Sequence, residues 1–133
     1  MAIADRAGLP VALSTASASP HETTFVRRLI TGRLTTGKPR KLIGDKAYDS
    51  DPLDATCRTL GVELIAPHRK NRTKPRSQDG RKLRRYRRRW KIERLFAWLQ
   101  NYRRLVTRYE RSAANFLAFL QLAAFLILAK KYL

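Results

Sequence analysis

Two acidic residues stand out as groups that could carry out chemistry. Asp45 follows Leu42, Ile43 and Gly44, a short apolar run that predicts a strand, so Asp45 lies where that strand ends. Sites in α/β proteins lie at the carboxyl ends of strands, and the glycine permits close approach of a ligand. Glu93 is the single acid in a predicted helix that is rich in arginine. Its carboxylate is a candidate metal ligand.

Each of these acids also has a purely structural interpretation. Glu93 can pair with the surrounding arginines, and spacing alone favours that salt bridge over metal binding. Asp45 can cap a turn, and the sequence does not separate this from a functional role. Of the acids nearby, Asp51 fits the N-cap of a helix, whereas Asp49 and Asp54 are expected to be exposed.

Other kinds of catalytic site find no support. The one cysteine, Cys57, excludes an internal disulfide and a multi-cysteine zinc site, and it fits a reducing, cytoplasmic location. His21 and His68 lack the spacing of a metal pair, and each is expected to be structural or solvated. The sequence also lacks a glycine-rich phosphate loop and the glycine-flanked serine of a hydrolase.

The net charge of +19 over 133 residues points to a polyanionic partner. Residues 66–111 hold 18 of the 29 lysines and arginines but only three of the ten acids. This excess is larger than solubility requires, so nucleic acid is the expected partner, with a solvated basic face or an anionic membrane surface as alternatives. Trp90 and Trp98 lie among these charges, and their helical spacing predicts that they belong to the core.

Strands that alternate with helices predict a single α/β domain. A hairpin comes first, a helix capped by Ser19 follows, and a basic loop separates the last strand from a long helix. The expected order is strands 2–5 and 11–15, helix 20–30, strand 41–44, a helix from 51 to Gly61, strand 62–66, loop 67–80 and helices 81–100 and 112–128.

The last of these helices is strongly apolar. Between Phe116 and Ala129 only Gln121 is polar, but these 14 residues fall short of the about 20 that a membrane span needs. We therefore expect a helix that packs on the core or on a partner, and no membrane segment.

Two motifs resemble those of the DDE transposases of bacterial insertion sequences, in the group named for insertion sequence five. The first is Gly44-Asp45-Lys46-Ala47-Tyr48-Asp49-Ser50, and the second is a Tyr, Arg, Glu series on one helix, carried by Tyr86, Arg89 and Glu93. Asp5 to Pro10 fits as well, so the resemblance spans essentially the whole chain. The family pattern ends in a lysine where this chain has Gln100, so no basic DNA contact is expected there.

The resemblance implies a ribonuclease-H-like fold in which three acids hold two divalent ions, Mg²⁺ or Mn²⁺. Asp45 would be the second acid and Glu93 the third, both as catalytic metal ligands, so the resemblance overturns the preference for a simple salt bridge. The full enzyme would nick the ends of its insertion sequence and join the freed 3′-hydroxyl to target DNA by two-metal phosphoryl transfer.

The first acid of that fold lies on its first strand. The hairpin of this chain matches the second and third strands, so we do not assign the first acid to Asp5. The resemblance therefore implies the carboxyl-terminal part of a transposase: a catalytic domain over 1–111 without its first strand, and an apolar helix in 112–133 that packs on it. This chain alone is expected to be inactive. An upstream half of the transposase could complete the site, and a homo-oligomer is possible.

The expected partner is double-stranded DNA, at the element ends and at the target. Tyr86 and Arg89 are expected near the phosphates, beside the metal ligands. Further phosphate contacts are expected from basic residues of the loop and the long helix: Lys70, Arg72, Lys74, Arg76, Arg84, Arg85, Arg87 and Arg88. The alternative is a catalytically dead DNA-binding fragment or regulator of transposition, which needs these basic residues but neither carboxylate.

Overall fold

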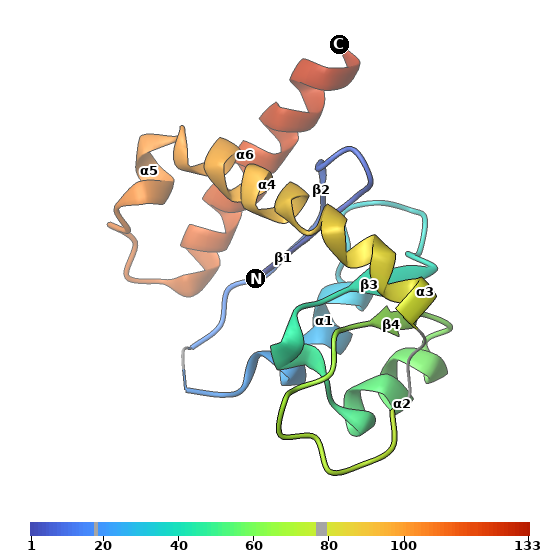
Figure 1. The fold of residues 1–133 in the computed structure, drawn as a ribbon. Coiled ribbons are helices and arrows are strands. Elements are labelled where there is room, and N and C mark those ends of the chain that lie inside the picture. The colour runs from blue at the N-terminus through green and yellow to red at the C-terminus, as the bar shows by residue number, and fades with distance from the viewer. Residues whose placement is uncertain (18, 77–79) are drawn as a thin grey trace.

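The computed structural model describes residues 1–17, 19–76 and 80–133. Figure 1 shows the α/β order that the sequence predicts, in which strands and helices alternate before a final long helix. In chain order the elements are β1 (Ala2–Ala4), β2 (Pro10–Leu13), η1 (Glu22–Phe25), α1 (Val26–Thr31), β3 (Lys41–Ile43), η2 (Lys46–Tyr48), α2 (Asp51–Thr59), β4 (Glu63–Ile65), α3 (Gly80–Leu83), η3 (Arg84–Arg88), α4 (Trp90–Gln100), α5 (Arg103–Val106) and α6 (Ala113–Tyr132), where η marks a 3₁₀ helix.

The predicted amino-terminal hairpin is present. Strands β1 and β2 pair antiparallel, with Ile3 opposite Ala12. Their turn is built by Asp5, whose Oδ1 accepts hydrogen bonds from the backbone N–H groups of Ala7 and Leu9, both at 2.8 Å. Gly8 takes a φ of +84°, a left-handed conformation that side chains other than hydrogen disfavour.

Strands β3 and β4 form a separate parallel pair, with Leu42 opposite Leu64. Helix α2 is the crossover between them, as parallel strands require. Its N-cap is Ser50 rather than the predicted Asp51, because Asp51 already has a helical backbone and Pro52 takes the next position. Gly61, with a φ of +68°, ends the helix and leads the chain into β4.

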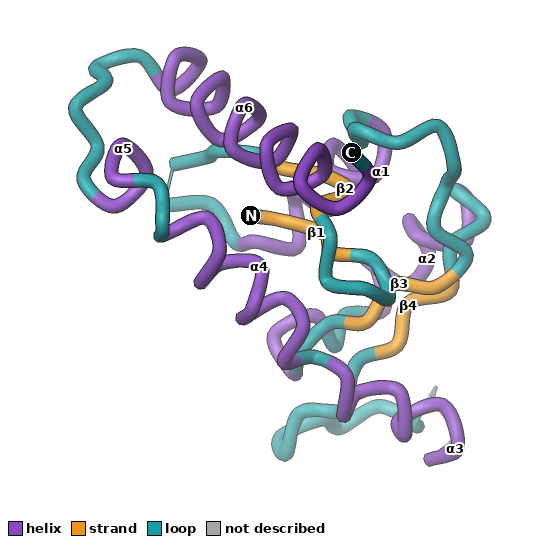
Figure 2. The backbone as a smooth tube through the Cα atoms, turned by 90° about the horizontal axis from the view of Figure 1, so that it is seen from above, coloured by secondary structure: helices purple, strands orange, loops and turns teal. Residues whose placement is uncertain are grey.

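The hairpin lies between two sets of helices (Figure 2). Alternate residues of a strand face opposite sides, so each face of the hairpin packs against a different set. Ile3 packs with the buried residues of α1, α2 and β4, among them Ile30 and Cys57. Ala2 and Ala4, on the other face, pack against α4 and α6, where Leu95, Leu99, Ala123, Ala124 and Ile127 are buried.

Helix α6 begins after Ser112 as predicted but extends to Tyr132, four residues beyond the predicted end. Ala123, Ala124 and Ile127 face the core, whereas Leu122 and Phe125 are more than half exposed. By length and composition this helix could cross a membrane, since an 18-residue window has a mean hydropathy of 1.8 and is only 11% buried. One such helix is weak evidence of a membrane span, because the core helix of a soluble protein can have the same length and composition.

Two further local predictions were wrong, and helix α5 was missed. The first helix begins at η1, and His21 caps it instead of Ser19, because the His21 side chain accepts from the Thr23 N–H. The long helix predicted over 81–100 consists of α3, η3 and α4, which follow one another from the β3–β4 pair toward α5 (Figure 1). Helix α5 has no periodic signal in its four residues. The basic loop predicted over 67–80 includes residues 77–79, which lie outside the described part of the chain.

Candidate metal centre and nucleic-acid interface

Asp45 stands directly after β3, at the strand end where the sequence placed it. Gly44 joins the two, and its N–H donates to the carbonyl of Ile65 in β4 at 3.0 Å. A Cβ on Gly44 would lie 2.9 Å from the Cβ and Cγ of Tyr48, so a glycine is required there. The Asp45 Oδ1 accepts from the Ala47 N–H at 2.8 Å and caps η2, and Oδ2 takes no part in this cap. The capping role is therefore real, and it uses one oxygen of the two.

Asp45 and Glu93 both contact the guanidinium group of Arg89. Its Nη1 lies 3.6 Å from Asp45 Oδ2, and its Nη2 donates to Glu93 Oε1 at 3.2 Å. All three side chains are accessible to solvent, at 41% for Arg89, 42% for Asp45 and 63% for Glu93. The salt bridge predicted for Glu93 is thus present, and the same arginine connects it to the acid at the strand end. The Tyr86 ring lies beside Arg89, 5.6 Å from the guanidinium carbon.

Helix α4 is anchored on the hairpin by a second arginine. Arg94 stacks between Trp90 and Trp98, 4.9 and 4.8 Å from their ring centres, and it donates to the carbonyl of Ala7. Gly8 leaves space for it, because a Cβ there would lie 2.7 Å from Arg94 Nη2. Trp90 is 50% exposed, so the prediction that it belongs to the core was wrong, whereas Trp98 packs against the buried cluster. These contacts fix the orientation of the helix that carries Glu93.

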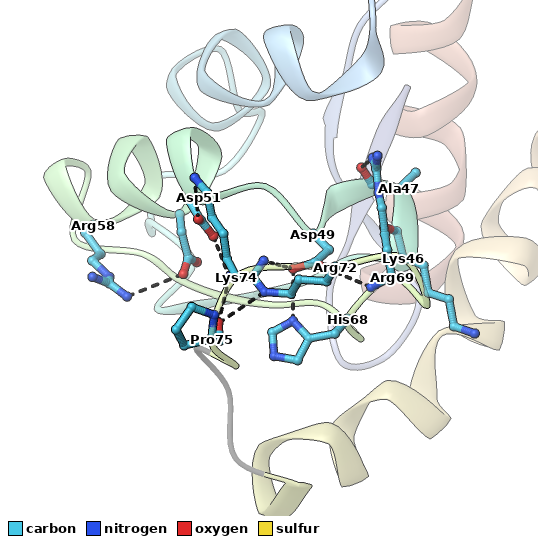
Figure 3. Close-up of polar contacts among 11 residues, drawn as sticks. Lys46, Ala47, Asp49, Asp51, Arg58, His68, Arg69, Arg72, Lys74 and Pro75 are labelled. Carbon is cyan, nitrogen blue, oxygen red and sulfur yellow. Dashed lines mark hydrogen bonds and ion pairs between the residues drawn. The ribbon is translucent and has the colours of Figure 1, made fainter.

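Asp49, four residues after Asp45, is the centre of a polar network (Figure 3). Its carboxylate accepts from His68 Nδ1 at 3.0 Å, from the Arg69 N–H at 2.8 Å and from Arg72 Nη1 at 2.8 Å. Arg72 also contacts Asp51 at 2.7 Å. The Asp49 side chain is only 5% exposed, so the prediction of an exposed Asp49 was wrong.

The same network fixes the start of the basic loop. Lys74 pairs with Asp51 at 3.2 Å, and the Arg69 guanidinium donates to the carbonyls of Lys46 and Ala47. Asp54, also predicted to be exposed, has a side chain that is 16% exposed and pairs with Arg58. The acids of this region other than Asp45 therefore hold the loop and helix α2 in place.

The pKa values near Asp49 follow from these contacts. Burial alone would raise the pKa of Asp49, but the hydrogen bonds from Arg69 and His68 and the charge of Arg72 outweigh it, so the pKa is lowered. Hydrogen bonds from Arg72 and then Lys74 lower the pKa of Asp51. Burial, followed by the hydrogen bond to Glu22, raises the pKa of Tyr48, so the phenol stays protonated.

The basic residues predicted to contact DNA fall into two groups. Arg72 is 12% exposed and committed to Asp49 and Asp51, and Lys74 shares the Asp51 pair while remaining 69% exposed. The others are exposed, and no acid in the described ranges 1–17, 19–76 and 80–133 pairs with them: Lys70, Arg76, Arg84, Arg85, Arg87 and Arg88. Four of these arginines lie in η3, directly before Arg89 in the chain, so the segment that leads into α4 carries positive charge that no acid of the described residues pairs with.

Asp45 and Glu93 fit part of a divalent-cation site. They are hard oxygen donors that already share a cationic group, and their exposure leaves room for the waters that Mg²⁺ retains. Within the part of the chain that the structure describes, no group of three His, Cys, Asp or Glu residues could hold a metal.

The sequence missed two features of this region. The Asp49–Arg72 pair joins residues far apart in the chain, and only the run Asp49, Ser50, Asp51 opposite a basic loop hinted at it. The Arg94 stack has a clearer signal, since Trp90, Arg94 and Trp98 recur every four residues and therefore share one helix face.

Comparisons with known proteins agree with these motifs. The sequence model of the family described as "Transposase DDE domain" matches residues 1–128. A curated protein of Burkholderia cepacia, "Putative transposase for insertion sequence element IS402", is 38% identical over 90 residues, which is 68% of this chain and 39% of that protein. The chain thus spans well under half the length of this relative. No solved structure matches the chain.

Proposed function

The chain belongs to the transposase DDE domain family, and we propose that Asp45 and Glu93 are two of the carboxylates that hold its divalent ions. The observation that carries this proposal is the convergence of both acids on Arg89, at 3.6 and 3.2 Å. The two acids come from different elements, one after β3 and one in α4, and α4 is held in its orientation by Arg94. A shared cation position is what a common metal site requires.

Membership of the family indicates an activity in DNA transposition. In the mechanism that we propose, divalent ions held there would supply the activation of a water or a DNA 3′-hydroxyl and the stabilisation of the leaving oxygen. The carboxylates of Asp45 and Glu93 would hold the ions, while Gly44 and the Ala47 N–H position Asp45 and the Arg94 stack positions Glu93. The exposed arginines of η3 neutralise the DNA phosphates beside them.

We further propose that the fold is of the ribonuclease-H type, with a catalytic domain over 1–111 and α6 packing on it. Within the described residues β1 pairs only with β2, and β3 only with β4. A strand seated between β1 and β3 would join both pairs into one sheet, and an acid at its end would lie near Asp45. In this proposal that strand and the third carboxylate come from outside these residues, so the 133-residue chain alone does not cleave DNA. Robust Mg²⁺-dependent nicking that Glu93→Gln abolishes would contradict this part.

Metal binding tests the site directly. We expect the chain to bind Mn²⁺, measured from the paramagnetic resonance of free Mn²⁺, with an affinity that falls about tenfold or more in Asp45→Asn and in Glu93→Gln. Asp54→Asn is the matched control, because it removes an acid that pairs with Arg58 instead. Equal losses in all three variants would show a diffuse charge effect and contradict the proposed site.

DNA binding tests the basic surface. We expect binding to duplex DNA whose dissociation constant rises steeply with salt, and a salt slope that falls by about 0.9 for each phosphate contact removed. The variants to compare carry alanine at the four free arginines of η3: Arg84, Arg85, Arg87 and Arg88. A slope that does not change would place the contacts elsewhere.

The alternative function is a catalytically inactive DNA-binding protein that regulates transposition. It requires the basic surface and no metal. The convergence of Asp45 and Glu93 argues for the metal-dependent role, and Mn²⁺ binding that does not depend on these residues would favour the alternative.

A further inference from the structure

We propose that Arg89 is an exchangeable counter-ion that couples DNA binding to metal binding at the Asp45–Glu93 pair. The inference rests on the proposed function, because it takes these two carboxylates as metal ligands. It adds that Arg89, which contacts both carboxylates when no metal is bound, moves away from them when a DNA phosphate and a divalent ion bind.

Arg89 occupies the position that a shared cation would take. One guanidinium nitrogen faces Asp45 Oδ2 and another faces Glu93 Oε1. A guanidinium and a divalent ion compete for the same oxygens, and like charges in one place repel each other. Metal binding therefore requires Arg89 to move, and until it moves it lowers the affinity of the site for metal.

The contacts of Arg89 are weak enough to exchange. Its approach to Asp45 at 3.6 Å is an ion pair without hydrogen-bond geometry, and the contact with Glu93 is a single hydrogen bond at 3.2 Å between exposed side chains. Arg72 provides the contrast within the same molecule. It is 12% exposed, donates to two acids at 2.8 and 2.7 Å, and is a fixed part of the loop. Arg72 is thus a fixed structural contact, whereas the weaker contacts of Arg89 allow it to change partners.

A phosphate is the natural second partner for Arg89. The neighbouring arginines of η3 are exposed, and no acid within the described residues pairs with them, so the surface around Arg89 attracts a phosphate backbone. An arginine binds phosphate through two parallel N–H groups, which is a better match than two separate carboxylates. A DNA strand on η3 would therefore draw Arg89 away and leave Asp45 and Glu93 free for metal.

The coupling is reciprocal. A DNA phosphate draws Arg89 away from the carboxylates, and metal binding requires Arg89 to be away from them, so each ligand strengthens the binding of the other. DNA should tighten metal binding, and metal should tighten DNA binding, through Arg89. The physical result is a site that takes up its ions when substrate is present.

Mn²⁺ affinity of Arg89→Gln is the first test. Exposed ion pairs contribute little each, so we expect Arg89→Gln to bind Mn²⁺ about three- to tenfold more tightly than the unchanged chain in the absence of DNA. Arg88→Gln is the matched control, with the same loss of charge one residue away and no contact with either carboxylate. Tighter binding in Arg89→Gln than in Arg88→Gln supports the exchange. Equal or weaker binding overturns it, because Arg89 would then act as a general charge or as a support for the carboxylates.

The second test is the effect of Mg²⁺ on affinity for a short DNA duplex, measured by fluorescence anisotropy at constant ionic strength. General competition of Mg²⁺ for DNA is common to all variants, so the comparison is between Arg89→Gln and Arg88→Gln. We expect the favourable effect of Mg²⁺ to be lost in Arg89→Gln and kept in Arg88→Gln. If the favourable effect of Mg²⁺ persists in both variants, the proposed coupling is wrong.

Failure of the inference and failure of the proposed function give different results. If Mn²⁺ binding does not depend on Asp45 and Glu93, the proposed metal site is wrong. If it depends on both acids but Arg89→Gln behaves as Arg88→Gln does, the metal site stands and the exchange of Arg89 is wrong.

Discussion

Replacing Asp49 should loosen the loop that follows β4, and the cost can be worked out from its contacts. Asp49 is 5% exposed and accepts hydrogen bonds from His68, from the Arg69 N–H and from Arg72, while Arg72 is itself 12% exposed. Removing one partner of a buried pair costs about 3–5 kcal/mol when the other charge cannot reach water. Arg72 keeps its contact with Asp51, so we expect Asp49→Ala to lower the free energy of unfolding by about 3 kcal/mol, at the low end of that range.

The pH dependence of this effect has a defined sign. The pKa of Asp49 is lowered from 3.8 in the folded chain, so its contribution is complete above about pH 4 and is lost as the pH falls through the lowered value. Asp49→Asn cannot ionise. The difference in unfolding free energy between the unchanged chain and Asp49→Asn should therefore be largest near neutral pH and shrink below about pH 4.

Urea unfolding followed by circular dichroism, at pH 7 and at pH 3, measures both quantities. Asp54→Asn is the control, because its pair with Arg58 is an i, i+4 contact whose arginine is 72% exposed and should contribute only about 0.3–0.5 kcal/mol. A loss for Asp49→Ala no greater than that of Asp54→Asn would contradict the buried pair of Asp49 and Arg72 as a source of stability. A difference for Asp49→Asn that does not change with pH would refute the role of its charge.

Two further substitutions test the parts that position the carboxylates. Gly44→Ala should cost about 1–3 kcal/mol of unfolding free energy, because its Cβ would meet the rigid base of the Tyr48 side chain at 2.9 Å. Gly37→Ala, where nothing lies within 4 Å, should change stability by less than about 0.5 kcal/mol, and equal costs in thermal unfolding would contradict this explanation. Arg94→Lys keeps the charge but loses the planar stack between two tryptophans, so it should change tryptophan fluorescence and cost about 1 kcal/mol or more. An unchanged emission spectrum would mean that the stack does not hold α4.

Much of the fold follows from local sequence signals. The hairpin is marked by two short apolar runs and the last helix by a long one, and Pro52 and Gly61 mark the two ends of α2. Asp45 was placed correctly because only a strand end and a glycine were needed to define its position. Cap positions were misplaced by one or two residues, and the larger failures occurred where partners come from distant parts of the chain.

Asp49 illustrates that limit, since its burial depends on Arg72, a residue that looks free in the sequence. Trp90 is similar, because an aromatic residue at helical spacing is expected inside, yet it lies at the surface and covers one face of Arg94. The link between Asp45 and Glu93 through Arg89 was open to prediction only in part. Spacing predicted a salt bridge between Glu93 and the surrounding arginines without singling out Arg89, whereas the contact with Asp45 depends on where the start of α4 lies relative to the end of β3.

The shared metal position of Asp45 and Glu93 is tested most directly by iron-mediated cleavage of the polypeptide. Fe²⁺ bound in place of Mg²⁺, with ascorbate and peroxide, generates hydroxyl radicals that cut the backbone near the ion, and mass spectrometry locates the cuts. We expect cuts in two separate segments, around residue 45 and around residue 93, both suppressed by excess Mg²⁺ and both lost in Glu93→Gln. Cuts confined to the Asp49–Asp51 region, or cuts near residue 45 that persist in Glu93→Gln, would contradict the shared metal position.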